Sequence, residues 1–148
     1  MIDIILCGSG GRMGAFVAES VKKEKEMQIV AGVDKINNGQ SFPVLNSFKD
    51  INLKADLIID FSNPALLDDM LEYAISKKIG VVIATTGYNE TQIEKIKSAT
   101  ALTDSYFGDS SNIGRQTSSS ASMMASQLAK NSAVMRTPSC TISNATFI

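Results

Sequence analysis

The stretch IDIILCGSGGRMG, residues 2–14, joins an apolar run to a glycine-rich turn and decides the fold of this chain. The run over residues 2–7 predicts a strand that is buried on both faces, which is typical of the parallel sheet in an α/β protein. Beyond the turn, apolar residues recur at helical spacing and predict an amphipathic helix that lies on the sheet. These residues are Met13, Phe16, Val17 and Val21.

The glycines of the turn are regularly spaced. Gly8, Gly11 and Gly14 form the pattern G-x-x-G-x-x-G, whereas the strict dinucleotide pattern G-x-G-x-x-G does not occur, because Met13 stands where its last glycine would fall. Glycines let the backbone turn sharply and let a bulky anion approach the amides. The following helix directs its unsatisfied N–H groups and the positive end of its dipole at the same place.

The turn therefore predicts a dinucleotide or nucleotide site, with a purely structural strand-to-helix turn as the alternative. Arg12 is either a solvated surface residue or a cation near the bound phosphate, and we expect Met13 to contact the core rather than the ligand. The candidate residues are Gly8, Ser9, Gly10, Gly11, Arg12, Met13 and Gly14.

Apolar runs and helical periodicity alternate as far as about residue 100. This alternation predicts a doubly wound parallel sheet of the Rossmann type with right-handed crossovers, over residues 1–107, followed by an atypical segment over residues 108–148. Pro64 suits the first position of a helix capped by Asn63 or Ser62. The further predicted strands span residues 27–33, 55–61 and 80–84, with a small strand or turn at 42–45, and the helices span 66–75 and 89–100. Their expected inward residues are Leu66, Leu67, Met70, Leu71, Ala74 and Ile75 in the first of these helices, and Ile93 and Ile96 in the second.

An acidic residue follows the second predicted strand. Asp34 lies 20 residues beyond Gly14, where a dinucleotide fold places the acid that binds the adenosine ribose, and an ordinary polar loop start is the alternative. A carboxylate there favours NAD because it repels a 2′-phosphate, and Lys35 partly offsets that repulsion. Ligands of such sheets bind beyond the carboxyl ends of the strands, so Phe61-Ser62 and residues 85–87 are expected in the same cleft.

Composition excludes several function classes. The 148 residues fit one domain, and the net charge of −1 without a basic run argues against nucleic acid or an anionic membrane as the main partner. No stretch approaches the about 20 apolar residues of a membrane span, and the strand at the amino end leaves no room for a signal peptide, so we expect a cytoplasmic protein. Cys7 and Cys140 form no metal or redox motif, and Cys7 is expected to be a small buried apolar residue.

Histidine is absent from the chain. Its absence removes the commonest general acid or base and the commonest metal ligand. Catalysis must therefore use Lys, Asp, Glu, Tyr or Cys, or lie outside this chain. The sequence alone identifies neither a catalytic residue nor a metal site.

Three motifs together resemble one family. The glycine turn, Asp60-Phe61-Ser62 and Ala84-Thr85-Thr86-Gly87 make the first 100 residues similar to 4-hydroxy-tetrahydrodipicolinate reductase, of lysine and diaminopimelate biosynthesis. The resemblance implies an NADH- or NADPH-dependent oxidoreductase that reduces a small cyclic substrate, with two-domain subunits that usually form tetramers. It also implies that the turn at Gly8–Gly14 holds the pyrophosphate, that Asp34 and Lys35 face the ribose, and that Ala84, Thr85 and Thr86 lie by the nicotinamide. The family often has glycine where Ala84 stands.

The resemblance weakens after residue 100. The first 100 residues carry 24 of the 29 charged side chains, while residues 101–148 carry five, together with eleven serines and five threonines. The stretch Ser110-Ser111-Asn112-Ile113 resembles one that touches the cofactor, and Pro138-Ser139-Cys140-Thr141 resembles the family's P-S-G-T substrate loop with Cys in place of Gly. The family's paired histidines are missing. The segment is an altered or truncated reading of a longer enzyme, a short divergent substrate segment, or a linker-like stretch with one helix over 121–130 that docks on the sheet.

Three functions follow from these observations. The favoured one is an NAD(P)H-dependent reductase of 4-hydroxy-tetrahydrodipicolinate to which this chain contributes mainly the cofactor domain. The second is a protein that binds NAD or NADP without catalysis, as the missing histidines suggest. The third is another dehydrogenase whose substrate site comes from the carboxyl-terminal segment or from a partner chain.

Overall fold

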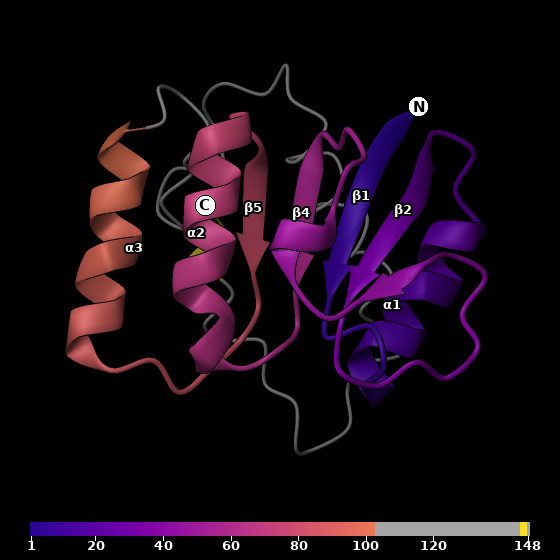
Figure 1. Cartoon of the computed structure of the whole chain (residues 1–148), viewed down its shortest axis with the longest axis horizontal. Helices are drawn as coiled ribbons and strands as arrows, with labels where there is room; N and C mark the ends of the chain where they lie inside the picture. Colours follow the sequence, from indigo (N-terminus) through magenta and orange to yellow (C-terminus); the bar gives the residue numbers. More distant parts are fainter. Residues whose placement is uncertain (103–145, 148) are drawn as a thin grey trace.

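The computed structural model describes residues 1–102 and 146–147. They form a six-stranded sheet in the order β3-β2-β1-β4-β5-β6. The first five of these strands are parallel, and the arrows of β1, β2, β4 and β5 point the same way in Figure 1. The strands are β1 (Ile2–Cys7), β2 (Met27–Val33), β3 (Val44–Leu45), β4 (Leu57–Asp60), β5 (Gly80–Ile83) and β6 (Thr146–Phe147). The helices are α1 (Arg12–Lys22), α2 (Leu67–Lys77) and α3 (Glu90–Leu102), with 3-10 turns η1 (Phe48–Asp50) and η2 (Pro64–Leu66). The predicted Rossmann-type parallel sheet is confirmed.

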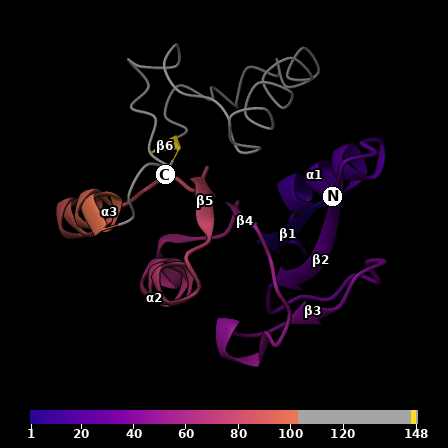
Figure 2. The ribbon, with the colours of Figure 1, turned by 90° about the horizontal axis from the view of Figure 1, so that it is seen from above.

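The sheet has a core on each face. In Figure 2, seen from above, α1 lies on one side of the strands and α2 on the other. Because side chains alternate along a strand, Ile4 and Leu6 of β1 belong to the cluster under α1, whereas Ile5 and Cys7 belong to the cluster under α2. All four are fully buried. The prediction that this strand is buried on both faces is therefore confirmed.

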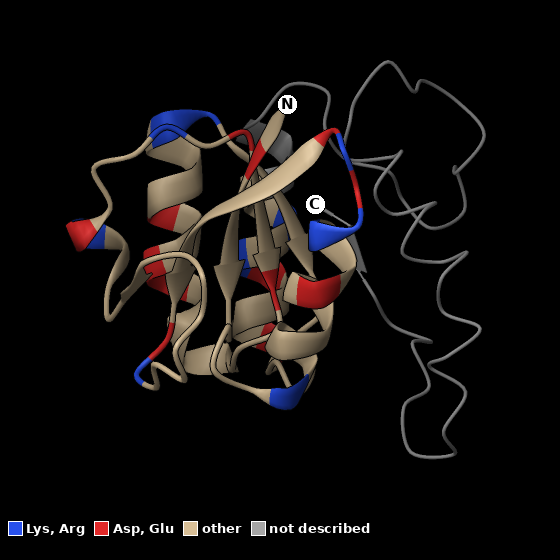
Figure 3. Cartoon of the chain, turned by 90° about the vertical axis from the view of Figure 1, so that its right-hand side faces the viewer, with Lys and Arg blue, Asp and Glu red and all other residues tan. Residues whose placement is uncertain are grey.

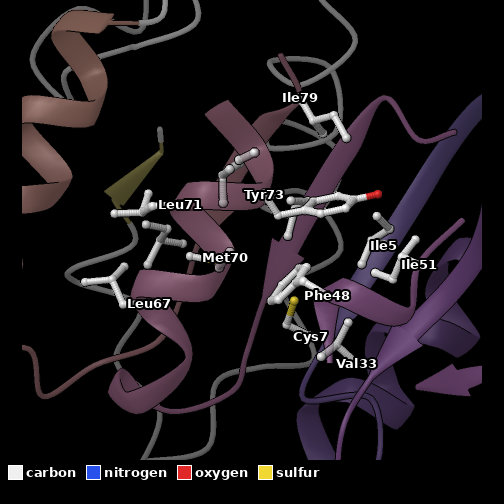
Figure 4. Packing of buried hydrophobic residues seen from close by; sticks show 14 of the residues in the cluster. Ile5, Cys7, Val33, Phe48, Ile51, Leu67, Met70, Leu71, Tyr73 and Ile79 are labelled. Carbon is white, nitrogen blue, oxygen red and sulfur yellow. The ribbon is translucent and has the colours of Figure 1, made fainter. Parts of the chain in front are cut away.

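The cluster under α2 extends beyond the sheet into the connection before β4. Phe48 of η1 packs against Tyr73 of α2, with ring centroids 5.4 Å apart and planes tilted by 37°, as Figure 4 shows. This contact explains one departure from the sequence prediction. Tyr73, which the helical pattern did not include, is buried, while Ile75, which it did include, is 38 % exposed. The segment before β4 that contains η1 covers α2 on the side of Tyr73, so the buried face of this helix is wider there.

The start of α2 and the burial of α3 test two further predictions. Asn63 caps η2, with its Oδ1 accepting from the N–H of Ala65 at 3.0 Å, and Pro64 takes the first helical position as predicted. In α3, Ile96 is buried as predicted, but Ile93 is 41 % exposed and its predicted inward position is wrong. Gln92 lies on the face of α3 that contacts the rest of the domain, and its side-chain amide donates to the Pro64 carbonyl at 2.8 Å. Ile93 lies beside that face.

The strand β6 comes from the segment over residues 108–148. It pairs antiparallel with β5 and adds the sixth strand to the edge of the sheet. The helix predicted over 121–130 lies outside the described residues.

Charge and hydropathy of the described part agree with the composition. In the view of Figure 3, basic and acidic positions both occur along the ribbon of the described residues. Within the described part, no helix has both the length and the apolar character needed to cross a membrane.

Candidate functional site

The glycine turn lies at the carboxyl edge of the sheet, between β1 and α1. The N–H of Gly11 donates to the Gly8 carbonyl at 3.1 Å, which closes the turn. Gly11 is the N-cap residue of α1 and has no side chain with which to cap the helix. The first N–H groups of a helix have no acceptor within it, and no acidic residue occupies the first turn of α1. The amides at the start of α1 are therefore suited to receive an anion.

Two glycines of the pattern are required by close packing. Gly8 has a φ of +76°, and a β-carbon there would lie 2.3 Å from the Phe61 carbonyl oxygen. A β-carbon at Gly14 would lie 2.1 Å from the Gly8 carbonyl oxygen. At Gly11 the nearest atom would be 3.4 Å away, which is ordinary contact. Close packing in the turn therefore explains why positions 8 and 14 are glycine. It does not explain why position 11 is glycine.

The turn is also in contact with the loop that follows β2. The N–H of Gly10 donates to Asp34 Oδ2 at 2.9 Å, and that of Ile36 donates to Asp34 Oδ1 at 3.0 Å. Asn38 Nδ2 donates to the Gly10 carbonyl at 2.8 Å, and Gln40 Nε2 donates to the Ser9 carbonyl at 3.0 Å. Asp34 therefore lies against the glycine turn, at the place where the sequence predicts it.

Sequence reasoning assigned no role to Asn38 and Gln40. Loop amides are common, and only the fold reveals that these two meet consecutive carbonyls of the turn.

The other predicted residues here are placed as follows. Lys35 and Arg12 are exposed, Met13 is half-buried, and Ser9 is buried with its hydroxyl directed at Gly32, where a β-carbon would lie 2.5 Å from Ser9 Oγ.

A buried carboxylate ends β4. Asp60 is 1 % exposed, and its Oδ1 accepts from the N–H of Ser62 at 3.0 Å and from the Ser62 hydroxyl. Its Oδ2 accepts from the hydroxyl of Tyr88 at 3.1 Å. Tyr88, which sequence reasoning missed, thereby ties the loop after β5 to the end of β4. Burial, and next the charge of Asp60, raise the pKa of Tyr88, so its hydroxyl remains the donor.

The loop after β5 completes this edge. Ala84 is half-buried and its N–H donates to the Asp60 carbonyl at 2.9 Å, while Thr86 is exposed. Thr85 is buried, and its Oγ1 has no partner at hydrogen-bond distance among the residues that the structure describes.

Strand register brings these segments together. Cys7 pairs with Val33 on one side and with Asp60 on the other, and Asp60 pairs with Ile83. Residues 8–14, Asp34, Phe61-Ser62 and 84–86 therefore follow directly on strand ends at one edge of the sheet. The predicted residues 110–113, and the Pro138–Thr141 stretch, lie outside the described residues.

Cys7 is fully buried at the end of β1, as the sequence predicts. Burial raises its pKa well above the ordinary value, and the charges of Asp60 and Asp34 act in the same direction. Because the thiolate is the reactive form of cysteine, this side chain is an inert packing group and not a nucleophile.

We therefore predict that Cys7 resists thiol reagents in the folded protein. In a Cys140→Ser variant, 5,5′-dithiobis(2-nitrobenzoic acid) at about pH 8 is expected to label Cys7 only after urea is added. Labelling of the folded variant as fast as of the unfolded one would contradict this burial.

Across the described ranges, no group of side chains is arranged to hold a metal ion.

Comparisons with known proteins show which sequences and folds this chain is similar to. The family model described as dihydrodipicolinate reductase, N-terminus, matches residues 2–107. The chain is 32 % identical over 115 residues to 4-hydroxy-tetrahydrodipicolinate reductase of Clostridium novyi, which covers 77 % of this chain and 46 % of the relative. It is 39 % identical over 99 residues to the enzyme of that name from Caldanaerobacter subterraneus, covering 67 % and 39 %. The chain thus spans less than half the length of these two relatives.

A solved structure supports the fold. Dipicolinate-bound dihydrodipicolinate reductase from Paenisporosarcina matches with a TM-score of 0.58 and 22 % identity, over 69 % of this chain and 43 % of that one.

Proposed function

The chain belongs to the family of dihydrodipicolinate reductase amino-terminal domains, and we propose that it binds NADH or NADPH as the cofactor domain of a 4-hydroxy-tetrahydrodipicolinate reductase. The observation that carries the proposal is the uncapped start of α1 at the carboxyl edge of the sheet, with Asp34 beside it. Diphosphate and ribose are the two groups that such an arrangement recognises.

The residues present fit the cofactor. Amides at the start of α1 would bind the diphosphate, since no side chain of Gly11 competes for them. Asp34 already accepts from two backbone amides, and its carboxylate has further lone pairs for ribose hydroxyls. The loop at 84–86 would lie by the nicotinamide, where the Thr85 hydroxyl is buried without a partner in the described part of the chain.

The chemistry divides between cofactor and protein. When bound, the nicotinamide would supply the hydride. The residues of this chain bind and orient it: Asp60 accepts from Ser62 and Tyr88 and so holds the loops after β4 and β5 in one position. Asp34 favours NADH over NADPH by repelling a 2′-phosphate, and the exposed Lys35 opposes that preference.

We also propose the limits and assembly of the functional unit. Residues 1–107 form the cofactor-binding domain, which the family match over 2–107 supports, and residues 108–148 correspond to a truncated or altered substrate domain. We propose that the protein is cytoplasmic and forms a homotetramer. The family resemblance supports the tetramer, which light scattering of the purified chain tests.

The test of the function is a titration with NADH and NADPH. Because the chain contains no tryptophan whose emission could be quenched, binding is followed by the directly excited fluorescence of the reduced nicotinamide. We expect saturable enhancement with at least one of the two cofactors. Absence of binding at millimolar cofactor would remove the proposal.

A second candidate is binding without catalysis. The absence of histidine from the chain favours it, because the family's substrate site uses paired histidines. Cofactor oxidation in the presence of 4-hydroxy-tetrahydrodipicolinate separates the two. Turnover supports the reductase, whereas binding without turnover supports the cofactor-binding protein.

A further inference from the structure

The loop over residues 34–43, here called the β2–β3 loop, holds two consecutive peptide groups of the glycine turn. The peptide between Ser9 and Gly10 is held at its carbonyl by Gln40 and at its N–H by Asp34. The next peptide, between Gly10 and Gly11, is held at its carbonyl by Asn38 and at its N–H by the Gly8 carbonyl. Every polar atom of both peptides is thus engaged.

Glycine makes this restraint necessary. A peptide flanked by glycines rotates with little steric resistance, and rotation of the peptide between Gly10 and Gly11 would redirect a carbonyl dipole. A carbonyl directed at a bound diphosphate would repel it. The side-chain amides of Asn38 and Gln40 oppose such rotation because each is a donor to one carbonyl.

The β2–β3 loop is itself arranged to deliver both amides. Gln40 Oε1 accepts from the N–H of Asn38 at 3.0 Å, so its Nε2 is the atom directed at Ser9. Between them Gly39 has a φ of +75°, and its N–H donates to Asn37 Oδ1 at 3.0 Å. The left-handed backbone at Gly39 thus lies between the two residues whose side chains meet neighbouring carbonyls of the turn. Gln40 is half-buried and Asn38 is exposed, so the Gln40 bond competes less with water.

We propose that Asn38 and Gln40 are positioning residues that set the glycine turn in its anion-binding conformation before the cofactor arrives. The inference rests on the proposed function, because the anion is the diphosphate of NADH or NADPH. Binding is then tighter because the turn does not have to be ordered when the cofactor binds.

The first test is cofactor affinity. Asn38→Ala and Gln40→Ala are each expected to raise the Kd for NADH, or for NADPH if the wild type prefers it, by about three- to ten-fold, with the larger effect at Gln40. Gln40→Met, which keeps the length of the side chain and removes the donor, is expected to match Gln40→Ala. The control is Gln28→Ala, because Gln28 Nε2 donates to Asp3 Oδ1 at 2.7 Å at the opposite end of the sheet. Its Kd is expected to equal that of the wild type.

The second test separates positioning from direct contact with the cofactor. In the ligand-free protein, amide hydrogen exchange at Gly10 and Gly11 is expected to be faster in both loop variants, while exchange in β5 is unchanged. Circular dichroism shows whether each variant is folded. A raised Kd with unchanged exchange at Gly10 and Gly11 would overturn the positioning role.

The outcomes also distinguish the inference from the function on which it rests. If the wild type binds cofactor and the loop variants bind it equally well, the inference is wrong and the proposed function stands. If the wild type binds neither NADH nor NADPH, both are wrong.

Discussion

Replacing Gly8 with alanine is expected to lower the free energy of unfolding by about 3–5 kcal/mol, a large part of the stability of a domain this size. Two costs add. Gly8 has a φ of +76°, a conformation that costs a residue with a side chain about 1–2 kcal/mol. The new β-carbon would also lie 2.3 Å from the oxygen and 2.6 Å from the carbon of the Phe61 carbonyl. Both atoms belong to the backbone, so no side chain can move aside, and β1 must separate from the loop after β4.

Gly39→Ala provides a matched control. Gly39 has a φ of +75°, almost that of Gly8, but nothing lies within 4 Å of the position of its β-carbon. Only the backbone cost is expected there, about 1–2 kcal/mol. Urea unfolding of both variants measures the difference, which is the cost of the overlap with Phe61. Equal losses for the two variants would show that β1 and the loop after β4 are farther apart than the structure has them.

Replacing Asp60 with alanine is expected to have the second largest effect, a loss of about 2–4 kcal/mol. The substitution leaves the N–H and hydroxyl of Ser62 and the hydroxyl of Tyr88, which are partly buried, without their acceptor. Asp60→Asn is the control, because an amide keeps the volume and one acceptor oxygen, and about half the loss is expected. Urea unfolding measures both. Similar stability of Asp60→Ala and the wild type would contradict the network.

The same network predicts a dependence on alkaline pH. Burial, and next the charge of Asp60, raise the pKa of Tyr88 above its ordinary value of about 10. The unfolded chain therefore loses this proton first. The stabilisation is complete below about pH 10 and is lost as the pH rises toward the raised pKa.

Urea unfolding at a series of pH values between about 8 and 11 tests this sign. The free energy of unfolding of Tyr88→Phe is expected to fall less steeply above pH 10 than that of the wild type. Phe cannot ionise and packs similarly. Parallel curves for the two proteins would show that the tyrosine pKa is not raised in the folded state.

Much of the architecture follows from local patterns. An uninterrupted apolar strand such as β1 has to be covered on both faces, and a helix that follows a tight glycine turn has to lie against it. Cys7 and Asn63 have the burial and the capping role that their positions in the pattern predict. The predicted site motifs lie together because each follows the end of a strand, and parallel strands in register end at the same edge of the sheet. The pairing of Cys7 with Val33 and with Asp60 confirms this register.

Side-chain burial on the outer helices is less predictable. Ile93 and Ile75 satisfy the helical period, yet both are exposed, while Tyr73 is buried although the period omits it. The period states which residues share a face of one helix. It does not state how wide a face the neighbouring segment covers, and here η1 covers the Tyr73 side.

The edge of the sheet at which the glycine turn and Asp34 lie could be predicted from residue order alone, because strand direction and turn chemistry are local properties. The partners at that edge could not. Asp34 with Gly10, Gln40 with Ser9, and Tyr88 with Asp60 join residues that are 24, 31 and 28 positions apart. Such pairs form only when separate loops are brought to the same strand ends, and a sequence pattern carries no information on which loop atoms then meet. Folding the sheet supplies that proximity, and the hydrogen bonds made there complete the turn.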